Sequence, residues 1–207
     1  EKLVYGGLTK VFAGIVIAPI GGLIVGVLLT GLIITVFANR KPAPVNKIFG
    51  RLQIISSAWF ALTHGANDGQ KTMGIIALIL FSAGLIPELE IPLWVIFAAA
   101  AAMGLGTFFG GYKVIKTLGV KITRLRPYQG FAAETGGGLM LAAFAILGIP
   151  ASTTHAITGT IMGAGAARRK RAVRWNVSRH IVFSWIITIP GSAAMGIGFT
   201  YLIHLFV

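Results

Sequence analysis

The sequence predicts an all-α protein that crosses a membrane several times as a polytopic helical bundle, and three observations support this fold class. The chain is strongly apolar, with a mean hydropathy of +0.85 and 56% hydrophobic residues. Only 11% of its residues are charged, whereas a soluble domain carries about 25%. Spanning a bilayer takes about 20 apolar residues, and uncharged runs of that length cover 11–39, 91–112, 135–167 and 180–207. We therefore treat 1–207 as a single transmembrane domain.

The formal net charge of +13 would suit a nucleic-acid-binding protein, but the positions of the basic residues exclude nucleic acid as a partner. They lie between the apolar segments, where they act as topology signals rather than as one binding face. By the positive-inside rule we place the three basic loops in the cytoplasm and the acidic loop with Glu88 and Glu90 outside. The basic residues of these loops are Arg40, Lys41, Lys47, Arg51, Lys113, Lys116, Lys121, Arg124, Arg126, Arg168, Arg169, Lys170, Arg171, Arg174 and Arg179.

The alternation of basic and acidic loops sets the expected path of the chain. Residues 11–38 run from outside to inside, and residues 52–86 return outward as a broken helix. Residues 93–112 run inward, and residues 181–207 run outward with a kink at Pro190. The chain begins with Glu rather than Met, so we expect a fragment or a processed chain.

The stretch 128–167 must begin and end on the cytoplasmic side, either as two full spans or as a re-entrant helical hairpin. Length favours the hairpin, because the arm after Pro150 reaches only to about Ala167. Gly148 and Pro150 supply its turn. Pairs of small residues at helical spacing suit close packing between helices. These pairs are Gly22/Gly26, Gly106/Gly110 and Gly159/Gly163.

The first polar break in the apolar sequence reads His-Gly-Ala-Asn-Asp-Gly-Gln-Lys. Gly65 permits unwinding, and Asn67 or Asp68 would cap a helix that restarts there and directs free N–H groups at an anion. Lys71 adds a full positive charge, and Asp68 can ligate a cation or bind a proton. Asn67 and Gln70 can bond ligand oxygens or ligate a cation. The alternative without a ligand is an ion pair between Asp68 and Lys71 at i, i+3 spacing.

The second polar break follows Pro150 and carries three consecutive hydroxyl residues. Ser152 or Thr153 is expected to cap the helix that follows. The hydroxyls of Ser152, Thr153 and Thr154, together with exposed backbone N–H groups, suit a tetrahedral oxyanion. The alternatives are a capped turn buried between helices and, for His155, an ordinary structural histidine.

Two of the five acidic residues, Asp68 and Glu134, lie inside apolar segments. If they share a cavity, desolvation and mutual repulsion disfavour the doubly charged state, and a bound Na⁺ or H⁺ would relieve that penalty. Coupled binding of a cation and an anion would follow. The alternative is that Glu134 pairs with Arg126 or another basic residue near the base of the hairpin.

Three motifs together resemble the inorganic phosphate transporter (PiT) family, the cation-coupled phosphate permeases. Residues 65–68 read Gly-Ala-Asn-Asp, residues 130–134 read Gly-Phe-Ala-Ala-Glu, and residues 150–155 read Pro-Ala-Ser-Thr-Thr-His. Their order and spacing match the family, and the resemblance covers the chain from about residue 11. It implies cation-coupled (Na⁺ or H⁺) symport of inorganic phosphate, with no enzymatic step and no organic cofactor.

The resemblance and the chemistry above together assign candidate site residues. Those for phosphate are Asn67, Asp68, Gln70, Lys71, Ser152, Thr153 and Thr154. Those for cation binding or coupling are Asp68, Asn67, Glu134 and His64, with Asp68 and Asn67 as Na⁺ ligands in a sodium-coupled protein. Many sodium-coupled members continue Asn-Asp with Val-Ala-Asn, whereas this chain has Gly-Gln-Lys. A fixed Lys71 charge could replace one bound cation, so the coupling ion and a metal–phosphate substrate stay open.

Family members contain two inverted halves with versions of these motifs, and this chain has one copy of each. It resembles the C-terminal inverted repeat, and the substrate of such repeats lies at their interface. The expected partners are inorganic phosphate, the other half and membrane lipid, with a homo-oligomer left open. We expect an integral protein of a bacterial or archaeal plasma membrane.

Three other functions are weighed against this one. A permease for sulfate or another tetrahedral anion would use the same donors. An intramembrane hydrolase built on Ser152, His155 and Asp68 lacks a nucleophile elbow around the serine. A non-transporting membrane assembly or receptor subunit would bind a ligand without flux.

Overall fold

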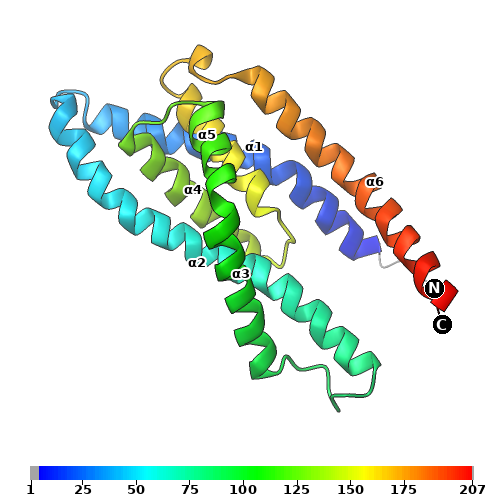
Figure 1. Cartoon of the computed structure of the whole chain (residues 1–207). Helices are drawn as coiled ribbons and strands as arrows, with labels where there is room; N and C mark the ends of the chain where they lie inside the picture. The colour runs from blue at the N-terminus through cyan, green and yellow to red at the C-terminus, as the bar shows by residue number, and fades with distance from the viewer. Residues whose placement is uncertain (1–4, 207) are drawn as a thin grey trace. The chain divides into compact units, whose positions relative to one another are not determined.

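The computed structural model describes residues 5–206 and confirms an all-α fold, 85% helical and without strands in that range (Figure 1). The chain divides into two units: the first ends at Val173, and the second begins at Arg174. The elements of the first unit are α1 (Tyr5–Val36), α2 (Pro42–Ser82), α3 (Leu93–Lys116), the π-helix η1 (Thr117–Ile122), α4 (Pro127–Ile146), α5 (Thr153–Ala166) and the 3₁₀-helix η2 (Lys170–Ala172). The second unit is α6 (Trp175–Phe206).

Within residues 5–206, three helices are long and apolar enough to cross a membrane: Gly6–Val36 in α1, Leu93–Tyr112 in α3 and Trp175–His204 in α6. Their apolar side chains are largely exposed; Phe108 and Phe109 of α3, for example, are 81% and 80% exposed. Such surfaces suit lipid rather than water. The helical backbone of α6 continues through Pro190.

The predicted break in the second helix is wrong, because α2 is one continuous helix of 41 residues. At 1.5 Å per residue it is about 60 Å long, roughly twice the thickness of the hydrocarbon core. A glycine inside a helix costs only about 1 kcal/mol, so Gly65 permits unwinding without enforcing it. Two of the polar side chains that follow Gly65 instead contact the region around the start of α5: Asp68 accepts from Thr153, and Lys71 donates to the Ala151 carbonyl.

The helical hairpin is formed by α4 and α5, with its turn where the sequence predicts it. Gly148 has φ +60°. The N–H of Ile149 donates to the carbonyl of Phe144 at 2.9 Å, and this bond closes the C-terminus of α4 as a Schellman motif. At the base of the hairpin, Gln129 Nε2 donates to the Ala164 carbonyl at 2.8 Å. The arm α5 has 14 residues, about 21 Å, which is short for a full crossing.

Glycines allow α1 to pack closely along α5. A Cβ atom on Gly22 would lie 2.7 Å from the Ala156 carbonyl oxygen, and one on Gly163 would overlap the Leu23 carbonyl. Gly26 and Gly159 face the partner backbone in the same way. Close packing at these two predicted pairs is confirmed, whereas a Cβ added to Gly106 or Gly110 on α3 would meet no neighbour within 4 Å.

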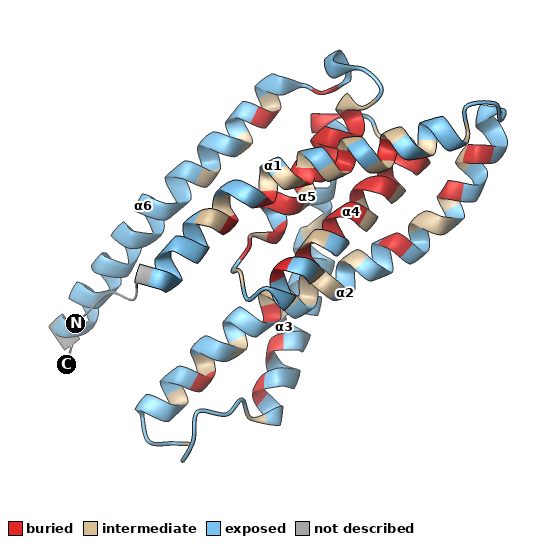
Figure 2. Cartoon of the chain, turned by 180° about the vertical axis from the view of Figure 1, so that it is seen from behind, coloured by how far each residue is buried: buried red, intermediate tan, exposed pale blue. Residues whose placement is uncertain are grey.

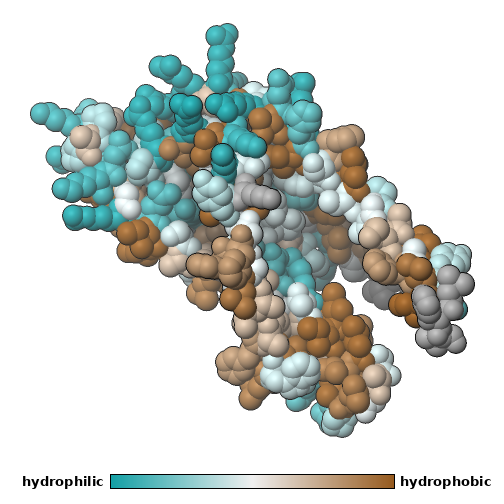
Figure 3. Space-filling view, in the orientation of Figure 1, coloured by the Kyte–Doolittle hydropathy of each residue, from teal (hydrophilic) through white to brown (hydrophobic). Residues whose placement is uncertain are grey.

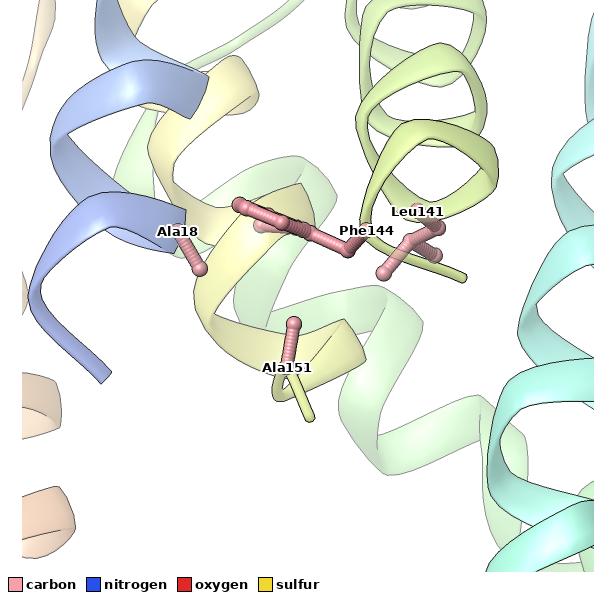
Figure 4. Close-up of a cluster of buried hydrophobic side chains, with 5 residues drawn as sticks. Ala18, Leu141, Phe144 and Ala151 are labelled. Carbon is pink, nitrogen blue, oxygen red and sulfur yellow. The ribbon is translucent and has the colours of Figure 1, made fainter. Parts of the chain in front are cut away.

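Buried residues concentrate on α4 and α5 (Figure 2). At the tip of the hairpin, Ala18 of α1 packs with Leu141, Phe144 and Ala151, and the ring of Phe144 extends toward α1 (Figure 4). This apolar cluster holds the residue that immediately precedes Ser152. The second polar break therefore lies on a packed support rather than on a free loop.

Hydrophilic side chains gather at the end of the first unit that holds the α1–α2 connection, and hydrophobic ones cover much of α3 (Figure 3). Arg40 and Lys41 are exposed in that connection. The uneven distribution agrees with the basic loops expected at one membrane surface. Which surface this is stays a prediction.

Candidate functional site

Asp68 is the centre of a polar cluster that joins α2 to the hairpin. Its Oδ1 accepts from Lys71 Nζ at 2.9 Å. Its Oδ2 accepts from Thr153 Oγ1 at 2.9 Å and lies 3.0 Å from His64 Nε2. Residues 64, 68 and 71 share one face of α2 because they are four and three positions apart. The predicted ion pair between Asp68 and Lys71 is present, but it is part of a larger network.

Lys71 makes a second contact that closes this network. Its Nζ donates to the carbonyl oxygen of Ala151 at 2.9 Å, just before the start of α5. The ammonium group therefore bridges a side chain of α2 and the backbone of the hairpin tip. Two motifs that lie about 80 positions apart in the chain meet through Lys71 and Thr153.

The N-terminus of α5 opens next to Asp68. Ser152, one of the two residues expected there, is the N-cap, and its Oγ accepts from the N–H of His155 at 3.3 Å. Its carbonyl accepts from the N–H of Ala156 at 3.1 Å. The N–H groups of Thr153 and Thr154 have no partner within residues 5–206. Of the two half-helix N-termini that the sequence suggests, the described structure contains this one.

Several of the predicted donors stay available around this cluster. Asn67 is half-buried, and Gln70 and Thr154 are exposed. Their side chains form no hydrogen bond within the part of the chain that the structure describes. Lys71 keeps 45% of its side chain exposed despite its two contacts. The arrangement thus offers amide, hydroxyl, backbone N–H and ammonium donors to a ligand without first breaking the Asp68 network.

Glu134 belongs to a separate cluster. Its Oε2 accepts from Ser56 Oγ at 2.6 Å, and its Oε1 accepts from Gln53 Nε2 at 3.3 Å. Ser56 precedes Asp68 by 12 positions on α2, which corresponds to about 18 Å. The expectation of one cluster containing Asp68 and Glu134 is therefore not met. The alternative, an ion pair between Glu134 and Arg126, is not met either, because the donors to Glu134 are neutral side chains. The backbone N–H of Arg126 is bonded to Gln129 Oε1 at 3.0 Å.

Aromatic side chains separate the two acidic clusters. Phe60 and Trp59 of α2 pack against Gly137 and Gly138 of α4, where an added Cβ on Gly137 would lie 3.1 Å from the Phe60 ring. The ring centroids of Phe60 and His64 are 5.8 Å apart. Along α2, the polar contact of Ser56 with α4 is thus followed by aromatic contacts with α4 and then by the polar contact of Asp68 with α5.

Gln53 and Ser56 are the partners of Glu134 that the sequence reasoning missed. They are three positions apart on one face of α2, in a mostly apolar segment, and this spacing is the available signal.

The sequence predicts Asp68 and Asn67 as Na⁺ ligands. The described residues contain no cluster of three His, Asp or Glu side chains that could hold a metal ion. Both carboxylate oxygens of Asp68 already face protein donors.

Comparisons with known proteins agree with the motifs. A family model described as the phosphate transporter family matches residues 34–196. Over 194 residues the chain is 48% identical to a probable low-affinity inorganic phosphate transporter of Rhizobium meliloti (strain 1021), covering 93% of this chain and 58% of that protein. A Bacillus subtilis (strain 168) protein with the same description is 40% identical over 193 residues, with the same coverage.

A solved structure described as the sodium-dependent phosphate transporter superposes with a TM-score of 0.63 at 27% identity. The superposition covers 88% of this chain and 56% of the solved one. The chain therefore spans a little over half the length of the relatives it matches. The match to the family model and these identities lead to one conclusion: the chain belongs to the phosphate transporter family.

Proposed function

We propose that this chain forms one half of a membrane permease for inorganic phosphate and that the Asp68 cluster with the N-terminus of α5 is its share of the substrate site. The observation that carries the proposal is the pair of contacts from α2 to the hairpin tip, Thr153 to Asp68 and Lys71 to Ala151, each at 2.9 Å. They bring a helix N-terminus, a lysine and a carboxylate to one place. Membership of a transporter family argues against the hydrolase alternative, and the Ser152 hydroxyl serves as a helix cap.

The chemistry of the cluster suits phosphate in particular. Phosphate oxygens accept hydrogen bonds from backbone N–H groups at a helix N-terminus and from ammonium, amide and hydroxyl donors, which Lys71, Asn67 and Thr154 supply. Phosphate at neutral pH also carries a P–OH group, which needs an acceptor. The Asp68 carboxylate has about four acceptor positions, three of which face Lys71, Thr153 and His64. The remaining one favours an anion with an O–H group over sulfate, which has none.

The rest of the transporter is also part of the proposal. The other half of the molecule would complete the site by inverted-repeat symmetry, with phosphate near the midplane. The short arm α5 would then lie in the membrane as part of a re-entrant hairpin, and the basic loops would face the cytoplasm. Alternating access would be a movement of the two halves about the bound anion.

The decisive test is uptake of radioactive phosphate by the complete transporter in proteoliposomes, with Na⁺ and pH gradients imposed separately. We expect uptake above that of empty vesicles under at least one gradient. A roughly 100-fold excess of sulfate should inhibit by less than about one fifth, because sulfate has no O–H group to donate to the Asp68 carboxylate. Strong inhibition by sulfate would contradict a phosphate-selective site, and phosphate binding without flux would favour a receptor or assembly subunit.

We propose Glu134 as the coupling residue of this half. Its carboxylate lies between α2 and α4 with two neutral donors, Ser56 and Gln53, and such a half-buried charge is stabilised when a proton or a small cation joins it. The solved relative is described as sodium-dependent, which supports a coupling cation without deciding between Na⁺ and H⁺.

Glu134→Gln should therefore remove the response of phosphate uptake to the gradient of the coupling ion. We expect stimulation by that gradient to fall at least about tenfold, because an amide neither binds a proton nor carries the charge that attracts a cation. Phosphate affinity should change less than threefold, since the Asp68 cluster lies about 18 Å away along α2. Ser56→Ala serves as the graded comparison and should weaken the response partly. A full gradient response in Glu134→Gln would refute the assignment.

A further inference from the structure

We propose that Lys71 acts as a built-in cation of the substrate site: its ammonium group occupies the position beside Asp68 that a transported monovalent cation would otherwise take. The inference rests on the proposed function and makes Lys71 a residue that determines ion specificity. It concerns which charges the site itself supplies and which it must recruit from solution.

The contacts of the ammonium group carry this inference. Lys71 Nζ lies 2.9 Å from a carboxylate oxygen of Asp68 and 2.9 Å from the carbonyl oxygen of Ala151. Carboxylate and backbone carbonyl oxygens are the ligands that hard cations take in proteins. The lysine nitrogen is therefore coordinated as a small cation would be, by one oxygen from α2 and one from the hairpin tip.

The remaining carboxylate oxygen does not offer a second place for a cation. Oδ2 of Asp68 accepts from Thr153 and faces His64 Nε2 at 3.0 Å. A further cation at Asp68 would have to displace one of these donors and lie close to the Lys71 charge. Like charges at that separation repel, and the repulsion is stronger in a partly dehydrated site.

The position of Lys71 also leaves the charge useful for an anion. Its side chain is 45% exposed, so part of the ammonium group can face a ligand while two of its protons hold Asp68 and Ala151. A phosphate at the N-terminus of α5 would then meet a fixed positive charge. Binding at this cluster needs no cation from solution, and cation coupling would have to arise elsewhere in the transporter.

A purely structural role for Lys71 makes a different prediction. If the lysine only joins α2 to the hairpin tip, its removal damages the site in a way that no dissolved ion repairs. If it serves as a built-in cation, its removal leaves two oxygens, from Asp68 and Ala151, that a small cation can bridge. Rescue by a monovalent cation separates the two roles.

The test compares Lys71→Gln with wild type and with Lys47→Gln, which removes a charge from the same helix outside the site. Initial phosphate uptake by the complete transporter is measured in proteoliposomes as choline is replaced by Na⁺, Li⁺ or K⁺ at constant pH and ionic strength. We expect Lys71→Gln to lose at least about tenfold in choline and to recover as one of these cations is raised. Lys47→Gln should follow wild type.

The charge moved per phosphate gives an independent readout. Uptake under a clamped potential should carry one more positive charge per phosphate in Lys71→Gln than in wild type, because a mobile cation has replaced a tethered one. Lys71→Arg keeps the charge and should keep the wild-type ratio. Uptake of Lys71→Gln that is unchanged in choline, or that no cation restores in a correctly folded variant, would overturn the proposal.

The outcome stays separable from that of the transport assay. If wild type moves no phosphate, the proposed function fails, and binding of radioactive Na⁺ to the detergent-solubilised protein tests Lys71 by itself. More Na⁺ bound per protein by Lys71→Gln than by wild type supports the built-in cation, and equal binding refutes it. If Lys71→Gln is poorly folded, a melting temperature that rises more steeply with Na⁺ in the variant than in wild type supports it. An equal or smaller rise overturns it.

Discussion

Replacing Asp68 by Asn should reduce coupled phosphate uptake at least about 30-fold. The Asp68 carboxylate accepts from Lys71, Thr153 and His64, and hydrogen bonds to a charged group are worth about 1.5–3 kcal/mol each. A loss of about 2 kcal/mol corresponds to roughly 30-fold, since about 1.4 kcal/mol is a factor of ten. The amide would also present N–H donors to side chains that are themselves donors. Initial uptake rates in proteoliposomes measure the effect.

Glu88→Gln is the matched control, because it makes the same carboxylate-to-amide change in the exposed acidic loop. Its uptake should stay within twofold of wild type. The substitution weakens three hydrogen bonds of the folded protein, so it could lower uptake by destabilising the fold. A thermal melt of Asp68→Asn therefore separates loss of the site from loss of the fold. Undiminished uptake by Asp68→Asn would refute the central assignment of the proposed site.

The fold class and most of the groups in the site are predictable from local signals in the sequence. Ser152 or Thr153 is expected as a helix cap because a hydroxyl after a proline turn satisfies the first free N–H groups, and the structure has Ser152 there. Gly148 is expected at the hairpin turn and has positive φ. The ion pair of Asp68 with Lys71 follows from i, i+3 spacing alone. Each of these depends on neighbours in the chain.

The predicted break at Gly65 is wrong because helix continuity is decided by tertiary partners. Asn67 and Asp68 are good cap residues, but a cap is needed only if the backbone unwinds. Here the Asp68 side chain accepts a hydrogen bond from Thr153 of the hairpin, and the backbone of α2 stays helical. Nothing local to the 64–71 segment reveals that a hydroxyl 85 positions later will lie against it.

The separation of the two acids is hidden from the sequence for the same reason. Asp68 and Glu134 are both rare charges in apolar sequence, which suggests one shared cavity. Their neighbours on α2 depend on the register between α2 and α4, which in turn depends on packing such as that of Phe60 against Gly137. Sequence spacing constrains positions along one helix but not the offset between two helices.

Gly163→Ala should destabilise the first unit by about 2–3 kcal/mol, the largest stability effect we expect from one added methyl group. The new Cβ would overlap the carbonyl of Leu23 and approach the N–H of Val27 at 2.9 Å, and both belong to the α1 backbone. Backbone atoms cannot rotate away as a side chain can, so the two helices must move apart. Overpacking of this kind costs about 1–3 kcal/mol, and the upper part of that range applies when backbone is met.

Gly31→Ala, in the partner helix α1, provides a control of opposite sign. A Cβ at Gly31 would meet nothing within 4 Å, and alanine is the better helix former by up to about 1 kcal/mol. Melting temperatures in one detergent should therefore fall for Gly163→Ala and hold or rise for Gly31→Ala. Since α1 and the hairpin tip support the Asp68 cluster, Gly163→Ala should also lower uptake. Equal melting temperatures for the two variants would show that α1 and α5 are not held at the distance the glycines permit.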